Sequence, residues 1–407
     1  MPESSSSAPP AASKADSPKA EQQHPSKTKT GGSHKEEPSS PKSGSSAKAS
    51  SPKSSSPKPI SEHPQTIDQT ILPASHWEPI SQENLPSDAD SAFSEAIGST
   101  ASLSSSILHY RELHGRTYHG EIGKGEAWTP NDEKMLESMD IHHHFCTLLI
   151  GDKLHLAPLT KSTTRKVLDI GTGTGIWAID FADQYPDAQV IGTDLSPIQP
   201  SWVPPNVKFE IDDANLPWTW PDNYFDYVHM RALFGAIIDW NELYKQAYRV
   251  TKPGGYFENH ESSVNWRDED PNAIPEDSPI GQWGKVFMEM GRKFGRSFRV
   301  IEDGIQEKAM TEAGFVDIEV RDFKCPVGGW PKDKGLKQIG LFSRLALDTD
   351  MEGYVLYAWD AVLGWSTEEI HVYLAHCRRQ LANPNLRPWY LHRVVYGRKP
   401  DQPAARQ

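Results

Sequence analysis

The chain has 407 residues and a formal net charge of −13 at pH 7. Residues 1–60 contain 9 Lys against 4 Glu and 1 Asp, a net of +4, so the other residues carry −17. This acidic balance argues against broad contact with a nucleic-acid backbone, because Lys and Arg dominate such contacts. We therefore expect no strong nucleic-acid signal in the folded domain.

Cysteine usage and hydropathy indicate an intracellular protein. Cys146, Cys325 and Cys377 are far apart and form no CxxC pair, which fits a reducing compartment without a disulfide framework. No apolar run approaches the roughly 18 residues of a membrane span, and the N-terminus lacks the apolar core of a signal peptide. We expect a soluble protein that is nuclear, cytoplasmic or both, with no membrane span.

The first 75 residues form a compositionally biased segment. They are mainly Ser, Pro, Lys, Ala, Gly and Glu, which predicts a disordered tail because little apolar surface is available for burial. The unit Ser-Pro-Lys recurs at residues 17–19, 40–42, 51–53 and 56–58. Such sites suit proline-directed kinases, and a plain solvated linker is an equal alternative.

A linker is expected over residues 76–106, an ordered domain over residues 107–400, and a short C-terminal tail over residues 401–407. From Val167 onward, short apolar runs alternate with helical segments, which is typical of an α/β fold with a parallel sheet. Seven strands are expected, near residues 166–170, 189–193, 207–211, 225–230, 254–260, 315–321 and 390–397. Helices are expected at residues 176–184, 241–251 and 303–313.

Two connections, residues 262–302 and 329–388, are longer than a βα unit needs. Long insertions in α/β enzymes often form lids over the carboxyl ends of the strands, where ligands bind. Both insertions are rich in tryptophan, which either lines an apolar substrate pocket or anchors the core of a helical cap. The tryptophans concerned are Trp266, Trp283, Trp330, Trp359 and Trp365.

The stretch VLDIGTGTGIWAID, residues 167–180, predicts a strand, a glycine-rich turn and a helix that together bind a nucleotide-type ligand. No Gly-Lys-Ser/Thr follows, which excludes a P-loop. The dinucleotide fingerprint requires a small last residue where this chain has Ile176, which disfavours NAD and FAD. The bare backbone of Gly171, Gly173 and Gly175 lets a ligand approach closely.

Acidic residues lie at or after the carboxyl ends of the first three predicted strands. Asp169 lies two residues before the first glycine, and Asp194 ends the next predicted strand. A carboxylate at that position accepts both hydroxyls of an adenosine ribose, and Asp213, after the third strand, is placed to accept an adenine amino group. An adenosine ligand without a pyrophosphate, such as S-adenosylmethionine, fits this arrangement.

With these motifs in place, the chain resembles a class I methyltransferase, and more narrowly the fungal family typified by the secondary-metabolism regulator LaeA. The residues that carry the resemblance are GRTYHG (115–120), PNDEKMLESMDIHHH (130–144), LDIGTGTGIWAIDFADQYPDAQVIGTDLSPIQP (168–200), DYVHMR (226–231), DWNELYKQAYRVTKPGGYFE (239–258) and YGRKP (396–400). The resemblance implies a Rossmann-like, seven-stranded sheet whose last strand is antiparallel, with S-adenosylmethionine as cofactor.

The resemblance also implies the cofactor-binding residues. They are Asp169, Gly171, Gly173, Gly175, Asp194 (ribose), Leu195, Asp213 (adenine) and Ala214. Methyl transfer depends mainly on positioning, so the sequence identifies no certain catalytic residue. His229, His260 and Glu261 lie at the carboxyl edge of the predicted sheet and are candidates for a general base, although each could equally orient the cofactor or pack a loop.

The run His142-His143-His144, followed by Cys146, raises the question of a metal site. Consecutive side chains on a helix point in different directions, so we expect no metal. The run is instead expected on a helix that covers the cofactor site, to which Tyr118 and His119 are also expected to contribute.

Three functions remain open. The first is an active S-adenosylmethionine-dependent methyltransferase that regulates fungal secondary metabolism or development, with a protein or a small molecule as acceptor. The second is a weakly catalytic or non-catalytic cofactor-binding subunit of a regulatory protein complex. The third is a small-molecule methyltransferase of a biosynthetic pathway. A nicotinamide oxidoreductase is disfavoured by Ile176.

Overall fold

The computed structural model describes residues 68, 70–80, 110–120 and 127–401, which all belong to one compact unit spanning residues 64–407. Its centre is a seven-stranded sheet with the order β5-β4-β3-β6-β7-β9-β8. The strands are β3 (Lys166–Ile170), β4 (Gln189–Asp194), β5 (Val207–Ile211), β6 (Phe225–Arg231), β7 (Thr251–Ser262), β8 (Val316–Pro326) and β9 (Trp389–Arg398). The last strand, β9, is antiparallel to β7 and β8. The predicted sheet is confirmed, whereas the Ser-Pro-Lys units lie outside the described residues.

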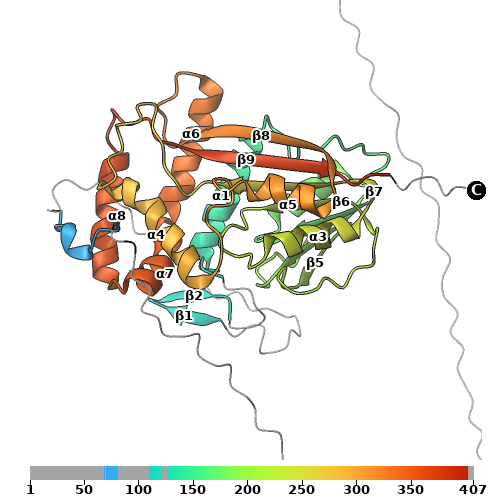
Figure 1. Cartoon of the computed structure of the whole chain (residues 1–407), viewed down its shortest axis with the longest axis horizontal. Coiled ribbons are helices and arrows are strands. Elements are labelled where there is room, and N and C mark those ends of the chain that lie inside the picture. Colours follow the sequence, from blue (N-terminus) through green and yellow to red (C-terminus); the bar gives the residue numbers. More distant parts are fainter. Residues whose placement is uncertain (1–67, 69, 81–109, 121–126, 402–407) are drawn as a thin grey trace, which may run out of the picture. The chain divides into compact units, whose positions relative to one another are not determined.

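Helices cover both faces of the sheet (Figure 1). Helix α2 (Ile176–Gln184) lies on one face, and α3 (Trp240–Val250) and α5 (Ile305–Ala313) lie on the other. Side chains alternate along β3, so Val167 packs with α2 while Leu168 and Ile170 pack with α3 and α5. All three helices were expected within two residues of these bounds.

Both long insertions fold into helices. The first contains α4 (Pro279–Phe294), and the second contains α6 (Lys334–Thr349), α7 (Met351–Leu363) and α8 (Thr367–Leu381). Helices α4, α7 and α8 share one hydrophobic core, which includes the fully buried Trp359, and Figure 1 shows them gathered at one end of the molecule. We refer to α4, α6, α7 and α8 as the cap.

Residues 70–80 lie ahead of the domain that the sequence predicts from residue 107. They include a short 3-10 helix, η1 (Ala74–His76), and the buried Trp77, whose ring lies 5.5 Å from that of Tyr373 in α8. The backbone oxygen of Glu78 accepts a hydrogen bond from His376 of the same helix. An aromatic anchor therefore fastens this segment to the cap.

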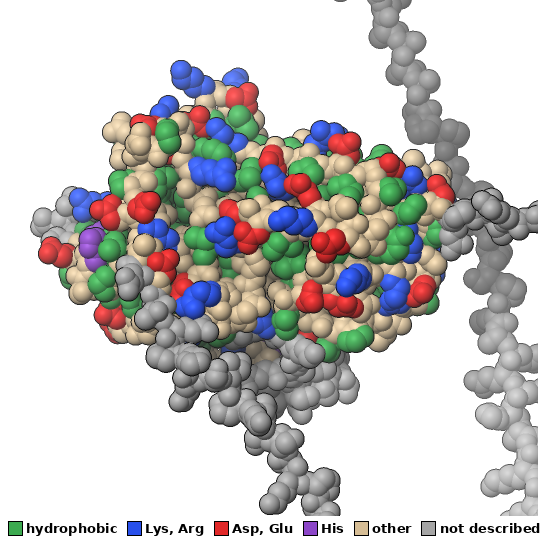
Figure 2. Space-filling model, viewed as in Figure 1, with side chains coloured by type: hydrophobic (Ala, Val, Ile, Leu, Met, Phe, Trp, Pro, Cys, Tyr) green, Lys and Arg blue, Asp and Glu red, His purple; other side chains and the backbone are tan. Residues whose placement is uncertain are grey.

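Charged side chains of both signs are interspersed over the face in Figure 2, with no basic patch on that face. None of the helices in the described part of the chain combines the length and the apolar character that crossing a membrane would require.

One partly buried arginine connects the beginnings of two helices. Arg116 lies in β2 (Arg116–Tyr118), which pairs with β1 (Arg111–Leu113) in a separate small sheet. Its guanidinium donates to Asp132, the N-cap of α1 (Glu133–Leu149), and to Asp350, the N-cap of α7, at 2.7 and 2.6 Å. Each aspartate also accepts from a backbone N–H of its own helix. Arg116 therefore compensates two helix-capping carboxylates at once.

We expect Arg116→Met to lower the free energy of unfolding by about 3–5 kcal/mol, because it leaves the fully buried Asp350 without its counter-ion. Chemical denaturation followed by circular dichroism measures the change. Arg321→Met is the control, since Arg321 and Glu319 form an exposed ion pair and its loss should cost less than about 1 kcal/mol. Equal losses in the two variants would contradict a supporting role for Arg116.

Candidate active site

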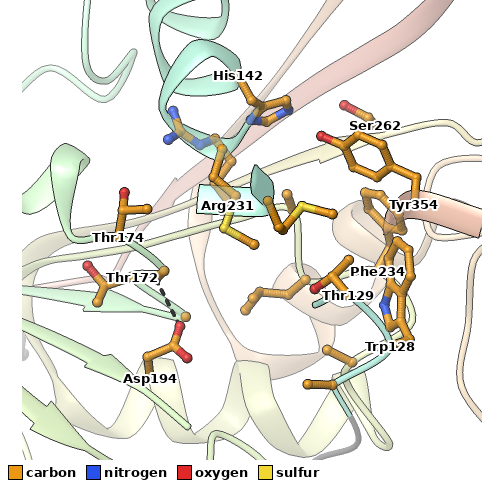
Figure 3. Close-up of a pocket in the computed structure, with 18 of the residues that line it drawn as sticks. Trp128, Thr129, His142, Thr172, Thr174, Asp194, Arg231, Phe234, Ser262 and Tyr354 are labelled. Carbon is orange, nitrogen blue, oxygen red and sulfur yellow. Dashed lines mark hydrogen bonds between the residues drawn. The ribbon is translucent and has the colours of Figure 1, made fainter. Parts of the chain in front are cut away.

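A cavity of about 380 Å³ lies at the carboxyl edge of the sheet, where ligands bind in open α/β folds. The loops after β3, β4, β5 and β6 line one side of it, and α1 and the cap line the other. Figure 3 shows Thr172, Thr174 and Asp194 on one side, and Trp128, Phe234 and Tyr354 on the other. The cavity therefore has a polar half beside the glycine loop and an aromatic half beneath the cap.

The three glycines of the loop all have positive φ, at 66° for Gly171, 57° for Gly173 and 82° for Gly175, a region that favours glycine. A Cβ at Gly171 would clash with Leu233, and one at Gly175 would clash with Phe209. At Gly173 the nearest atom would be the sulfur of Met139 at 3.8 Å. Gly173 thus presents bare backbone to open space, whereas packing excludes a side chain at the other two.

Gly175 differs from the other predicted cofactor residues in its position. It is the N-cap of α2 and is not among the described residues that line the cavity. The other seven predicted cofactor-binding residues do line the cavity: Asp169, Gly171, Gly173, Asp194, Leu195, Asp213 and Ala214. The structure therefore brings seven of the eight to one wall.

Asp194 joins the first two βα turns. Its carboxylate accepts from the backbone N–H of Gly173 at 2.8 Å and of Ser196 at 3.0 Å (Figure 3 marks the first of these). Burial raises its pKa, because desolvation disfavours the charged form. Asp213 is also buried, and one of its oxygens accepts from the backbone and the side chain of Asn215.

Asp169 and His229 form a buried pair beneath the loop. His229 Nδ1 lies 2.7 Å from Asp169 Oδ1, and Thr172 donates to the other oxygen of that carboxyl. The imidazole stacks on Trp177 with ring centroids 3.8 Å apart. Burial raises the pKa of Asp169 to about 7 and lowers that of His229 well below its ordinary value. Burial thus disfavours the charged form of both groups.

His229 is the only one of the three candidate bases among the described residues lining the cavity. His260 is bonded to Glu258 at 2.6 Å behind the wall. The Glu261 carboxylate accepts from the backbone N–H groups of Leu233 and Phe234, and burial raises its pKa to about 7. His260 and Glu261 therefore support the wall from behind.

The three consecutive histidines of α1 point to different surroundings. His142 faces the cavity, and burial lowers its pKa to about 3. His143 is bonded to Asp180, and His144 is exposed and lies 4.5 Å from the Phe342 ring. Within the described ranges, no group of three His, Cys, Asp or Glu side chains is arranged to hold a metal ion.

The aromatic half comes from segments that are far apart in the sequence. Two insertion tryptophans, Trp266 and Trp283, line it, while Trp359 and Trp365 belong to the core of the cap. No sequence pattern singles out the remaining lining residues. They include Trp128, Met139, Arg231, Phe234, Ser262, Phe287, Tyr354 and Tyr390. Arg231 was visible only as the last residue of the DYVHMR motif.

Comparison with known proteins identifies the family. A family model described as a methyltransferase domain matches residues 142–320. Methyltransferase pytC of Aspergillus terreus is 37% identical over 315 residues, which cover 77% of this chain and 95% of that protein. The secondary metabolism regulator LAE1 of Cochliobolus heterostrophus is 32% identical, over 69% of this chain and 92% of its own. Secondary metabolism regulator laeA of Aspergillus fumigatus is 31% identical, over 68% of this chain and 74% of its own.

The chain belongs to the LaeA-like family of methyltransferases. It is an S-adenosylmethionine-dependent methyltransferase, and the predicted family, fold class and cofactor are confirmed. The bare backbone at Gly173 and the enclosed acidic groups beside it fit an adenosine ligand that carries a sulfonium cation.

The buried carboxyl of Asp169 makes stability depend on pH. Its pKa is about 7 in the folded state against an ordinary 3.8, so the folded chain retains a proton that the unfolded chain loses. The stability that Asp169 contributes therefore falls as pH rises from about 4 to 7. We expect the difference in unfolding free energy between the wild type and Asp169→Asn to shrink by up to about 1.4 kcal/mol per pH unit in that window.

Thermal and urea unfolding of both proteins at half-unit pH steps measures this difference. Asp187→Asn, at an exposed ion pair with Arg165, controls for the general effect of removing a carboxylate. A constant difference for Asp169→Asn would show that Thr172 and His229 keep the carboxylate ionised in the folded state.

Proposed function

We propose that this methyltransferase acts on a small, mainly apolar molecule that the cap encloses beside the cofactor. The observation that carries the proposal is the aromatic half of the cavity, which is continuous with the glycine-loop half. A pocket lined by aromatic side chains with a few polar groups is typical of small-molecule sites. A protein acceptor would instead need a path for a polypeptide segment through the cap.

For the cofactor, we propose the roles that the motifs predict. Asp194 binds the ribose hydroxyls, and Asp213 accepts from the adenine amino group. The backbone of Gly171 and Gly173 lies against the methionine portion, and Gly175 acts indirectly by fixing the start of α2. The remaining lining residues Asp169, Leu195 and Ala214 complete the wall of this half.

For the acceptor, the polar groups within the aromatic half give orientation. The Tyr354 hydroxyl lies 2.9 Å from Ser138 Oγ, which itself donates to the backbone oxygen of Ala346. Tyr354 therefore donates to Ser138 and keeps its own lone pairs for an acceptor hydroxyl. Ser262, at the end of β7, lies 3.0 Å from His392 Nδ1 and also lines the cavity.

S-adenosylmethionine supplies a methyl group that its sulfonium already activates. What the chain supplies is position and the exclusion of water: the loop after β3 and the cap hold the two ligands against each other, which accounts for large accelerations in displacement reactions. His229 Nε2 has no hydrogen-bond partner among the described side chains and backbone groups. Burial lowers the pKa of His229 well below its ordinary value, so this side chain is poorly suited to accept a proton.

The ribose role of Asp194 predicts the effect of its removal. We expect Asp194→Ala to weaken binding of S-adenosylhomocysteine by about 10- to 100-fold, because hydrogen bonds to a charged group contribute about 1.5–3 kcal/mol each. Isothermal titration of the full chain measures the affinity, with the exposed Asp187→Ala as control. Unchanged affinity in Asp194→Ala would remove the ribose role.

The acceptor proposal predicts which class of molecule receives a labelled methyl group. The full chain, supplied with methyl-labelled S-adenosylmethionine and a fungal extract, should label compounds below about 1 kDa that partition into organic solvent, because an apolar cavity selects apolar ligands. Phe234→Ala should lower this labelling about 10-fold through lost apolar contact, with unchanged affinity for S-adenosylhomocysteine. Phe342→Ala is the control, since Phe342 lies outside the cavity lining. Label recovered mainly on protein would contradict the proposal.

A regulatory role in secondary metabolism is the second candidate. The similarity to LAE1, at 32% identity over 92% of that protein, supports it. In a fungal strain that lacks its own LAE1, restored metabolite production by the wild type but not by Asp194→Ala would support regulation that needs the cofactor. Restoration by both would instead favour a non-catalytic subunit that acts in a protein complex.

A further inference from the structure

Arg231 is a partly buried cation at the boundary between the two halves of the cavity. It is the last residue of β6. Because Ile170 of β3 pairs with Met230 of β6, the residues that follow, Gly171 and Arg231, emerge at the same edge of the sheet. Arg231 lines the cavity, and Figure 3 shows it between Thr174 of the glycine loop and Tyr354 of the cap.

The guanidinium of Arg231 forms no ion pair with a carboxylate within the described part of the chain. The one hydrogen bond that this group makes there runs from Nη2 to Nδ1 of His143 at 3.0 Å. Asp169, at the same edge, is engaged by Thr172 and His229 instead. A guanidinium keeps its charge in proteins and has five N–H donors, so most of the donors of Arg231 remain for another partner.

His143 fixes the direction of those donors. Its Nε2 lies 2.9 Å from Asp180 Oδ2, on α2, and its Nδ1 accepts from Arg231. The ring is therefore the neutral tautomer with its proton on Nε2, and burial, which lowers its pKa, favours that neutral form. A neutral acceptor orients the guanidinium without cancelling its charge. The remaining N–H donors of Arg231 are therefore available to bind an anion.

The chemistry of the site selects a carboxylate as that anion. A planar guanidinium binds a carboxylate through two parallel hydrogen bonds. An unpaired cation would also repel the sulfonium that the same cavity has to hold, unless the ligand brings its own negative group. The methionine portion of S-adenosylmethionine has such a group, and the proposed pose lays this portion over Gly171 and Gly173, at the edge from which Arg231 emerges.

We propose that Arg231 is the receptor for the α-carboxylate of the cofactor, oriented by His143 and Asp180. This inference rests on the proposed cofactor pose. It assigns the end of β6, in addition to the glycine loop, to cofactor binding. It also makes His143 a positioning residue, since it acts on the ligand only through Arg231.

Two ligands that differ by the carboxylate alone provide the test. They are S-adenosylhomocysteine and its decarboxylated analogue, S-adenosyl-3-thiopropylamine. We expect the full-length wild type to bind the first about 10- to 100-fold more tightly in isothermal titration. Arg231→Met should abolish this preference by weakening only S-adenosylhomocysteine, and Arg231→Lys should retain part of it, because an ammonium keeps the charge but not the fork.

The surface variant Arg165→Met is the control and should bind both ligands as the wild type does. Equal weakening of both ligands in Arg231→Met and Arg231→Lys would show a structural role and overturn the inference. Unchanged affinity for S-adenosylhomocysteine, with impaired methyl transfer, would assign Arg231 to an anionic acceptor and also overturn it. Failure of the cofactor pose is recognised separately, because Asp194→Ala would then retain full affinity for S-adenosylhomocysteine.

Discussion

The cavity depends on the ion triad of Arg116, Asp132 and Asp350. Helices α1 and α7 begin at the two aspartates and face the cavity, α1 through Met135, Met139 and His142 and α7 through Tyr354. One guanidinium holds both beginnings in register, even though the three residues span more than half of the chain. Because Asp350 is fully buried, its carboxylate cannot exchange this partner for water. The distance across the cavity therefore follows from bidentate geometry as well as from apolar packing.

Acidic and basic side chains lie on opposite sides of the cavity. The side beside β4 and β5 carries Asp194 and Asp213, and the far edge of β3 and β6 carries Arg231. Backbone N–H donors stabilise Asp194, whereas Asp169 and His229 are both pushed toward their neutral forms by burial. A zwitterionic ligand with hydroxyls at one end and a carboxylate at the other matches this order of charges. Trp128, Phe234 and Tyr354, in the aromatic half beneath the cap, carry no formal charge.

Much of the fold could be predicted from sequence because its signals are local. The strands, the helices after them and the glycine turn are each encoded within about ten residues, through apolar runs and capping residues. Seven of the eight predicted cofactor residues line the cavity for the same reason, since each lies at the carboxyl end of a strand or in the turn after it. What remained hidden depends on neighbours distant in the chain. Only the packed structure shows that Phe209 leaves no room for a side chain at Gly175, whereas Gly173 faces open space. It also shows that Trp266 and Trp283 reach the cavity lining, whereas Trp359 does not.

The same distinction explains why no catalytic base stood out. His229, His260 and Glu261 occupy equivalent positions in sequence, each near the end of a strand, yet their partners differ. His260 is engaged by Glu258, and Glu261 holds the loop after β6 through two backbone N–H groups. His229 reaches the cavity, but burial disfavours its protonation, and the hydrogen bond with Asp169 and the stack on Trp177 orient its ring. A site built in this way stabilises a geometry, which suits a displacement at a carbon that is already activated.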